Sequence, residues 1–346
     1  MKKLLLILTA CSGMAFAKPT VEILATGGTI AGVAASQTST TYKAGSLTAE
    51  QLISSVSGLD GLANIQYEQV YNKDSGDVTL ADWVKLAAAV EKAAADPKIN
   101  AIVITHGTDT LAETSYFLDL VAKTTKPIVL VGSMRAATAM SADGPLNLYN
   151  AVAVATSPQS VGKGVLVAMN DEIFDGRNVD KTNTTNVATF QSLNTGPIGR
   201  VYMGKVTYST TVTRPNTVNT PFKITADTKL PSVGIIYINV GTDMDMLNNI
   251  LRDKNLKGLV IAGVGDGNIP SYAKDFLLKA RKQGIVIVRS SNVGSGEVSY
   301  DYNNWDTTCD LIAGSDLNPE KARILLMLSL MQTTNTKQIQ QIFNTY

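Results

Sequence analysis

Three short polar segments hold residue types that could act as a nucleophile and its base. Residues 26–32 read TGGTIAG, residues 105–110 read THGTDT, and Lys181 precedes the run TNTT. A threonine hydroxyl is a weak nucleophile that needs an adjacent base. A lysine that is desolvated by burial and held by an acid can be that base near neutral pH. Together the segments predict a group made of Thr108, Asp109 and Lys181.

Each segment also has a structural interpretation that needs no chemistry. The first could be a tight strand-to-helix turn in which Thr29 is a capping residue. Thr108 or Asp109 could cap the helix that follows. Lys181 could be an ordinary solvated cation. The residue types alone leave these structural interpretations open beside the nucleophile-and-base interpretation.

The single histidine, His106, narrows the chemistry further. One histidine excludes histidine-rich metal sites, an HExxH zinc protease and any mechanism that needs two histidines. A Ser-His-Asp hydrolase would have to use His106, but the chain has no G-x-S-x-G turn to go with it. We therefore interpret His106 as a hydrogen-bonded structural residue and expect no metal.

The charge balance bears on the partners of the protein. Thirty basic side chains oppose 29 acidic ones, which gives a net charge of +1. So balanced a chain has no basic field, and nucleic acid is not an expected partner.

The elements that must position these segments alternate along the chain. Short, continuous apolar runs are typical of strands buried on both faces of a parallel sheet. They occur at 21–25, 101–104, 128–131, 165–169, 233–238, 258–262 and 285–288. Helical patterns lie between them at 79–95, 110–123, 146–155 and 320–331. The alternation predicts an α/β fold.

The chemistry-bearing residues follow the predicted strands. Thr29, Thr108, Asp109, Ser133 and the pair at 170–171 each come just after an apolar run. Ligands of open α/β sheets bind beyond the carboxyl ends of the strands. We therefore expect these residues to converge on one site.

Two irregular stretches mark a loop and a domain boundary. Residues 33–46 are too long for an ordinary strand-to-helix connection and predict a mobile loop or lid that carries Tyr42. Residues 214–231 hold three prolines and separate two β-α series. We predict a linker there, between domains at 18–213 and 232–346.

The first 17 residues have the pattern of a signal peptide. Lys2 and Lys3 precede a brief apolar run, and residues 15–17 read AFA, the form of a signal peptidase site. Cleavage near Ala17 predicts a periplasmic protein, with no membrane segment in its mature form. A small-residue run that ends in Cys11 offers lipoprotein processing as the alternative.

The joint pattern resembles the bacterial type II L-asparaginases, the periplasmic asparaginase/glutaminase family. The matching segments are collinear and span nearly all of the mature chain. They are ATGGTIAG (25–32), ITHGTDT (104–110), SADGPLNLYNAV (141–152), MNDEIFDGR (169–177), KTNTT (181–185), AGVGDGN (262–268) and LNPEKAR (317–323).

The resemblance implies a hydrolase that converts L-asparagine and water to L-aspartate and ammonia, with possible lower activity on L-glutamine. Thr29 would be the nucleophile that forms an acyl-enzyme. Thr108 would belong to a second group with Asp109 and Lys181. Tyr42 matches a tyrosine that contacts the nucleophile when the loop closes.

The same resemblance implies how substrate is held. Ser75 and Asp109 match residues at the substrate α-carboxylate and α-amino group, and the Ser133 backbone matches the oxyanion donor. Asn268 matches a residue from a neighbouring subunit. The glycines of the site, Gly28, Gly76 and Gly107, are the other substrate-binding positions.

The resemblance also implies architecture. We expect two Rossmann-like domains, a larger N-terminal one with a mostly parallel sheet and a smaller, flavodoxin-like C-terminal one. The family forms homotetramers with sites at subunit contacts and uses no cofactor.

The chain departs from the family pattern at three places. Where the family usually has a glutamate from the adjacent subunit, our alignment places Tyr302 or Asn303, and Glu297 or Asp301 could substitute. Gly76 and Asp266 also replace common family residues. We predict that asparagine is preferred over glutamine.

Three alternatives remain. A periplasmic solute-binding protein also carries an export signal and two α/β domains. A Rossmann oxidoreductase needs a third glycine that the segment GGTIAG lacks. The missing glutamate leaves an inactive family member as the third.

Overall fold

The computed structural model describes residues 18–346, and its larger sheet contains eight strands. Their spatial order is β12-β11-β8-β7-β6-β5-β1-β4. The strands are β1 (Thr20–Gly27), β4 (Asn64–Lys73), β5 (Ala101–Thr105), β6 (Ile128–Val131), β7 (Val165–Met169), β8 (Glu172–Asp175), β11 (Gly199–Tyr202) and β12 (Lys205–Tyr208). The five neighbouring strands β4, β1, β5, β6 and β7 are parallel. Strands β8, β11 and β12 extend the sheet beyond β7, each antiparallel to its neighbour.

The parallel strands have the flavodoxin-like order. Numbered along the chain, β4-β1-β5-β6-β7 lie in the order 2-1-3-4-5. The order reverses between β1 and β5, and such a switch point is where open α/β sheets bind ligands. The loops after β1 and β5 carry Thr29 and Thr108.

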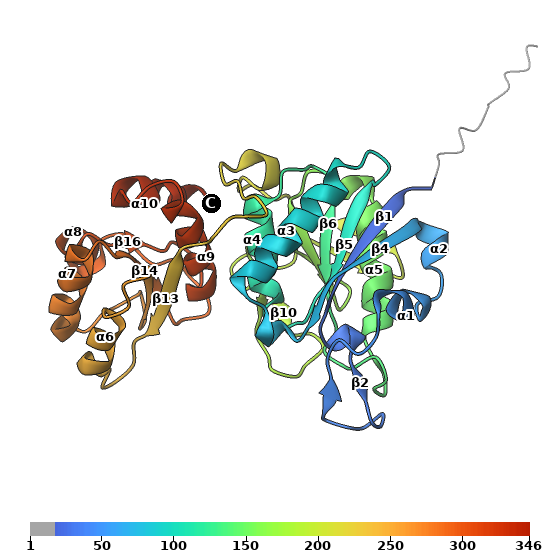
Figure 1. Cartoon of the computed structure of the whole chain (residues 1–346), viewed down its shortest axis with the longest axis horizontal. Helices are drawn as coiled ribbons and strands as arrows, with labels where there is room; N and C mark the ends of the chain where they lie inside the picture. Colours follow the sequence, from blue (N-terminus) through green and yellow to red (C-terminus); the bar gives the residue numbers. More distant parts are fainter. Residues whose placement is uncertain (1–17) are drawn as a thin grey trace, which may run out of the picture.

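Helices cover both faces of the larger sheet (Figure 1). Helices α3 (Leu80–Ala95) and α4 (Leu111–Val121) pack together on one face. Helix α5 (Gly144–Thr156) packs with α2 (Leu59–Leu62) on the other, near α1 (Ala49–Ser54). The connections through α3, α4 and α5 all lead in the same direction across the sheet, but α5 lies on the opposite face, so its connection has the opposite hand. Connections between parallel strands are right-handed with few exceptions. The α3 and α4 connections therefore follow the rule, and the α5 connection is the left-handed exception.

The smaller sheet has four parallel strands in simple chain order, β13 (Ser232–Tyr237), β14 (Leu256–Gly263), β15 (Val286–Ser291) and β16 (Ile312–Ala313). One face packs on α9 (Pro319–Leu330) and α10 (Thr336–Thr345), and this core is continuous with that of the larger sheet. The other face holds a separate core with Cys309, under α6 (Met244–Ile250), α7 (Lys274–Lys282) and α8 (Trp305–Cys309).

Two short ribbons stand apart from both sheets. The predicted loop at 33–46 contains β2 (Val33–Ala34) paired with β3 (Tyr42–Lys43), and it projects from the larger-sheet part (Figure 1). Strand β9 (Asp180–Lys181) pairs with β10 (Phe190–Gln191). The segment at 33–46, predicted as a loop or lid, thus contains a two-stranded ribbon of its own.

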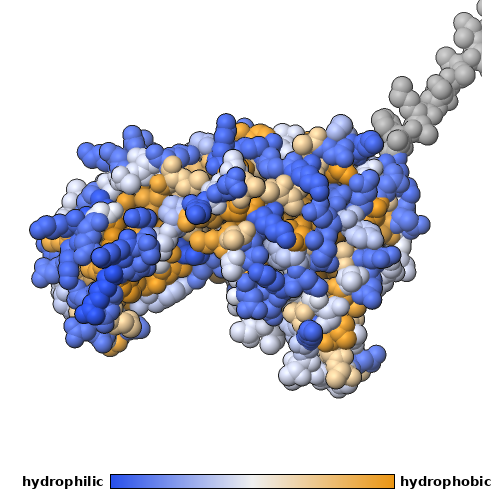
Figure 2. All heavy atoms as spheres, in the orientation of Figure 1, coloured by the Kyte–Doolittle hydropathy of each residue, from blue (hydrophilic) through white to orange (hydrophobic). Residues whose placement is uncertain are grey.

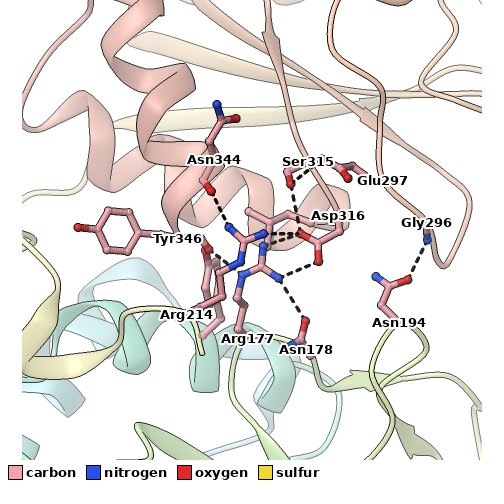
Figure 3. A network of polar contacts seen from close by, with 12 residues as sticks. Arg177, Asn178, Asn194, Arg214, Gly296, Glu297, Ser315, Asp316, Asn344 and Tyr346 are labelled. Carbon is pink, nitrogen blue, oxygen red and sulfur yellow. Dashed lines mark hydrogen bonds and ion pairs between the residues drawn. The ribbon is translucent and has the colours of Figure 1, made fainter. Parts of the chain in front are cut away.

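Polar contacts join the two sheets' parts of the molecule (Figure 3). The guanidinium of Arg177 donates to both carboxylate oxygens of Asp316, at 3.0 and 2.5 Å. The backbone N–H of Gly296 donates to Asn194 Oδ1 at 2.9 Å. The Asp316 pKa is lowered, because the bonds and charge of Arg177 outweigh the opposing effect of burial.

The expected α/β fold class is confirmed, with a large, mostly parallel sheet and a separate smaller parallel sheet. The flavodoxin-like strand order belongs to the larger sheet, whereas the smaller one follows chain order. The predicted signal peptide at 1–17 lies outside the described residues. Within residues 18–346, no helix is long and apolar enough to cross a membrane.

Candidate active site

The loops after β1 and β5 meet at two glycines. A Cβ atom on Gly28 would lie 2.4 Å from Gly107 Cα, and Gly28 has a φ of +80°. Only glycine allows this approach in this backbone conformation. Thr29 directly follows Gly28, and Thr108 directly follows Gly107. The close contact between the two glycines therefore places the loops of the two threonines side by side.

Thr29 lies in a short 3-10 turn, Thr29–Ala31, whose N-cap is Gly28. The Thr29 hydroxyl is within 2.7 Å of the Tyr42 hydroxyl, and either oxygen can donate the hydrogen bond. Thr29 is 7% exposed, whereas Tyr42 on β3 is 42% exposed. The capping interpretation of Thr29 is therefore wrong, and the projecting ribbon supplies its partner.

Lys181 connects Thr108 to Asp109. Its Nζ donates to Thr108 Oγ1 at 3.0 Å and to Asp109 Oδ1 at 2.6 Å. The Lys181 side chain is 18% exposed and that of Asp109 is 64% exposed. The three residues of the predicted threonine–acid–lysine group are thus in contact, and the Lys181 side chain is mostly covered. The N-cap of α4 is Thr110 instead of Thr108 or Asp109.

Ser75 braces the same loop from the end of β4. It is buried in a 3-10 turn, Ser75–Asp77, and its Oγ accepts the backbone N–H of Asp109 at 3.2 Å. Its carbonyl oxygen accepts the Thr110 hydroxyl at 3.0 Å. The neighbouring Gly76 is exposed. Ser75 therefore contacts the backbone of the Asp109 loop.

Ser133 follows β6 and is fully buried. Its hydroxyl donates to Arg135 O at 2.7 Å. The loop onward to α5 reaches the turn of Thr29, where Ala137 N–H donates to Gly32 O at 2.9 Å. The left-handed crossover makes this contact possible, because it places α5 on the α1–α2 side of the sheet.

His106 has a complete set of hydrogen bonds. Burial lowers the pKa of His106 to about 4, against the opposing effect of the hydrogen bond to Gly107. The neutral ring donates from Nδ1 to Gly107 O at 2.8 Å, because a carbonyl only accepts. Nε2 then accepts the Thr114 hydroxyl at 3.1 Å, and Thr114 accepts the Trp83 indole N–H at 2.9 Å. His106 is thus structural, as expected.

Asn268 lies on the smaller-sheet part and has its polar contacts there. Its backbone pairs with Val264, and its Oδ1 accepts the Asn303 amide at 3.4 Å. The alignment put Asn303 or Tyr302 at the missing glutamate, so the two candidate intersubunit positions are neighbours. The buried Arg289 donates to both Asp306 and the Asp266 carbonyl and so joins these loops.

Sequence reasoning missed the residues behind Lys181. Lys321, in α9, is 2% exposed, and its Nζ lies 3.0 Å from Asp180 Oδ1. Asn318 Nδ2 donates to the same oxygen at 2.8 Å. Little in the sequence marks Lys321, because it is one of three charged residues, with Glu320 and Arg323, in the first turns of α9. Among residues 18–346, no group of three His, Cys, Asp or Glu side chains could hold a metal ion.

Comparisons with known proteins cover both parts of the chain. Residues 20–214 match the asparaginase N-terminal family model, and residues 232–343 match the glutaminase/asparaginase C-terminal domain model. L-asparaginase 2 of Escherichia coli K12 is 48% identical over 97% of this chain and 95% of that protein. The probable periplasmic L-asparaginase of Haemophilus influenzae is 47% identical over 95% and 93%. A crystal structure of a probable cytoplasmic L-asparaginase from Campylobacter jejuni has a TM-score of 0.92 at 43% identity, covering 95% of this chain and 100% of that one.

Proposed function

This chain belongs to the asparaginase family, and on that premise we propose that it hydrolyses L-asparagine to L-aspartate and ammonia through Thr29. The observation that carries the proposal is the pair of hydroxyls on adjoining loops, each with its own polar partner. Thr29 has Tyr42 at 2.7 Å, and Thr108 has Lys181 at 3.0 Å. Family membership sets aside the solute-binding and oxidoreductase alternatives.

In the first half-reaction, Thr29 Oγ bonds to the side-chain amide carbon of asparagine. Its proton passes through the Tyr42 oxygen to the amide nitrogen, which leaves as ammonia, and an ester on Thr29 remains. The Ser133 backbone N–H stabilises the oxyanion, and a preorganised donor of this kind contributes about 3 kcal/mol. The ribbon that carries Tyr42 excludes bulk water while the ester exists.

In the second half-reaction, water hydrolyses the ester to aspartate and returns the proton to Thr29. The Thr108–Lys181–Asp109 group orients and deprotonates that water. Asp109 also holds the substrate α-amino group, and Ser75 and the backbone at Gly28, Gly76 and Gly107 hold the α-carboxylate. Each of these residues lies on a strand-end loop of the larger sheet, except Lys181 on β9.

Ammonia release from the mature chain and from Thr29→Ala tests the proposal. We expect rapid release from L-asparagine and a loss of at least about a thousandfold in kcat for the variant, because the hydroxyl proposed to form the ester is removed. Thr38→Ala, an exposed threonine of the same loop, is the matched control and should retain the wild-type rate. Full activity of Thr29→Ala would refute the assignment of the nucleophile.

Substrate preference is tested in the same assay. We propose that asparagine is preferred, with Gly76 and Asp266 as the positions that distinguish this chain from family members. Comparable kcat/KM values for asparagine and glutamine would contradict the preference.

We propose further that the chain is exported to the periplasm and works as a homotetramer of two-domain subunits, with the boundary at 214–231. The name of the Haemophilus relative supports the compartment, although the Campylobacter structure is titled cytoplasmic. Large apolar side chains are exposed on the smaller-sheet part, among them Val240 and Met246. Figure 2 shows apolar areas interspersed with hydrophilic ones on the side of the molecule in view.

A further inference from the structure

We propose that the smaller-sheet part positions the catalytic lysine of its own chain: Lys321 and Asn318, at the start of α9, hold the strand that carries Lys181. The inference rests on the proposed role of Lys181 at Thr108. Lys321 and Asn318 touch no reacting atom, so they are positioning residues.

Strand β9 has little backbone pairing within its own part of the fold, although Val179 before it and Phe190 opposite it are buried in the core. It is two residues long, and it pairs only with β10 in a ribbon separate from the larger sheet. The pairing brings Lys181 opposite Phe190, and Thr182 N–H donates to Thr189 O at 2.8 Å. A short isolated ribbon of this kind is only marginally stable by itself.

The anchor comes from α9. Lys321 Nζ donates to the carbonyl oxygen of Val179 at 2.5 Å and lies 3.0 Å from Asp180 Oδ1. Asn318 Nδ2 donates to the same carboxylate oxygen at 2.8 Å, while Asn318 Oδ1 caps α9 by accepting the Lys321 N–H. Two side chains of one helix turn therefore hold the two residues that precede Lys181.

The two sides of the ribbon have separate tasks. Successive side chains of a strand point to opposite faces. Asp180 faces α9, and Lys181 accordingly faces Thr108 and Asp109, at 3.0 and 2.6 Å. Holding Asp180 fixes the backbone from which the long, flexible lysine side chain extends. A displacement of about 1 Å in such a group can slow a reaction on the order of a hundredfold.

Burial makes stability alone a poor explanation for Lys321. The side chain is 2% exposed, in the first turn of a helix whose buried residues are mostly apolar. Burying an ion pair commonly stabilises a protein no more than apolar residues of similar volume would. The contacts of Lys321 are instead directed at the segment before the catalytic lysine, which is the arrangement that a positioning role requires.

The test is Lys321→Met in the full mature chain, because methionine keeps the volume and removes the ammonium. We expect kcat for asparagine to fall about tenfold or more, with KM changed by less than about twofold, since the substrate-holding loops are untouched. Hydrogen exchange should quicken in residues 179–191 and stay unchanged in the larger sheet. A variant with wild-type kcat and wild-type exchange at 179–191 would overturn the proposal.

Asp316→Asn is the matched control. Asp316 also joins the two parts, but its ion-pair partner is the Arg177 guanidinium instead of a residue of β9. It should lower thermal stability without the selective loss in kcat or protection at 179–191. Equal losses of kcat at equal stability in both variants would assign Lys321 a structural role only and overturn the proposal.

A second variant guards against misfolding of the first. Asp180→Asn keeps the size and the hydrogen-bond acceptor but removes the ion pair, and it should shift kcat and exchange in the same direction by a smaller factor. If the wild-type chain released no ammonia, the proposed function would fail. The exchange measurement would then still decide whether α9 holds β9.

Discussion

Lys181 joins a hydroxyl and a carboxylate that otherwise have no direct contact through their side chains. Its Nζ reaches Thr108 Oγ1 and Asp109 Oδ1. Lys181→Met should therefore lower kcat by about a hundredfold or more, because the base of the second half-reaction is lost. Rapid-quench measurement of ammonia and aspartate checks this, with a burst of ammonia expected if ester hydrolysis has become limiting. Equal rates for both products from the first turnover, with normal kcat, would contradict it.

The pH dependence of stability gives a test of His106. Burial lowers the pKa of His106 to about 4, against about 6.5 in the unfolded chain. Between these values the unfolded chain binds one more proton, so the free energy of unfolding declines as pH falls from about 6.5 to about 4, by up to about 1.4 kcal/mol per pH unit. Urea titrations of wild type and His106→Gln should differ by this slope, and parallel curves would count against a buried neutral ring.

Asp119 should affect the pH dependence of stability in the opposite direction from His106. Burial raises the pKa of this carboxyl to about 8, with a smaller opposing effect from the Val165 N–H that donates to it at 2.7 Å. The folded chain then binds the extra proton, so stability declines as pH rises from about 4 to about 8. Asp119→Asn retains an acceptor for Val165 and should remove that decline. An unchanged pH dependence in urea titrations would show that Asp119 ionises normally.

Among the elements, burial on both faces decided what the sequence could predict. Strands β1, β5, β6 and β7 are continuous apolar runs because helices cover both sides of them, and all four were predicted. Strand β4 was missed, because an edge strand with many exposed residues has no such run. The hand of the α5 crossover and the Lys321–Asp180 contact depend on how distant elements pack, and no local pattern encodes them.

The start of α3 is an element that local sequence did encode. Thr79 and Asp82 form a capping box, with Thr79 N–H donating to Asp82 Oδ2 at 2.8 Å. Thr79→Ala should cost about 1 kcal/mol of unfolding free energy, as measured by urea titration, because the Asp82 N–H loses its acceptor. Activity at 25 °C should be unchanged, since no active-site residue contacts Thr79. A large loss of kcat would mean that α3 positions the site more directly than its contacts indicate.

At the level of the whole molecule, the residues that the sequence analysis assigned to one active site fall into two groups. Thr29, Tyr42, Ser75, Thr108, Asp109 and Lys181 come together within one chain. Asn268 has its side-chain contact with Asn303 instead. A pattern along one chain cannot say which copy of the chain completes a site, so the intersubunit assignment came only from the family resemblance.

Mixing inactive subunits tests that assignment. If Asn268 serves the neighbour, Thr29→Ala and Asn268→Ala chains refolded together should regain roughly a quarter of wild-type activity, because half of the paired subunits contain one intact site. Each variant refolded alone is the control, and sedimentation gives the oligomeric state. Mixtures no more active than the mean of the two variants would place Asn268 outside the partner's site.

Cys309 lies in the separate core between the smaller sheet and helices α6, α7 and α8, where it is 1% exposed. It is the sole thiol of residues 18–346. If the proposed cleavage removes residues 1–17, Cys309 is the one thiol left and reports on local opening of the structure around it. A thiol-reactive dye will label Cys309 only when α7 and α8 separate from the smaller sheet. The labelling rate therefore measures how often the smaller-sheet part opens locally, and no cysteine has to be introduced for the measurement.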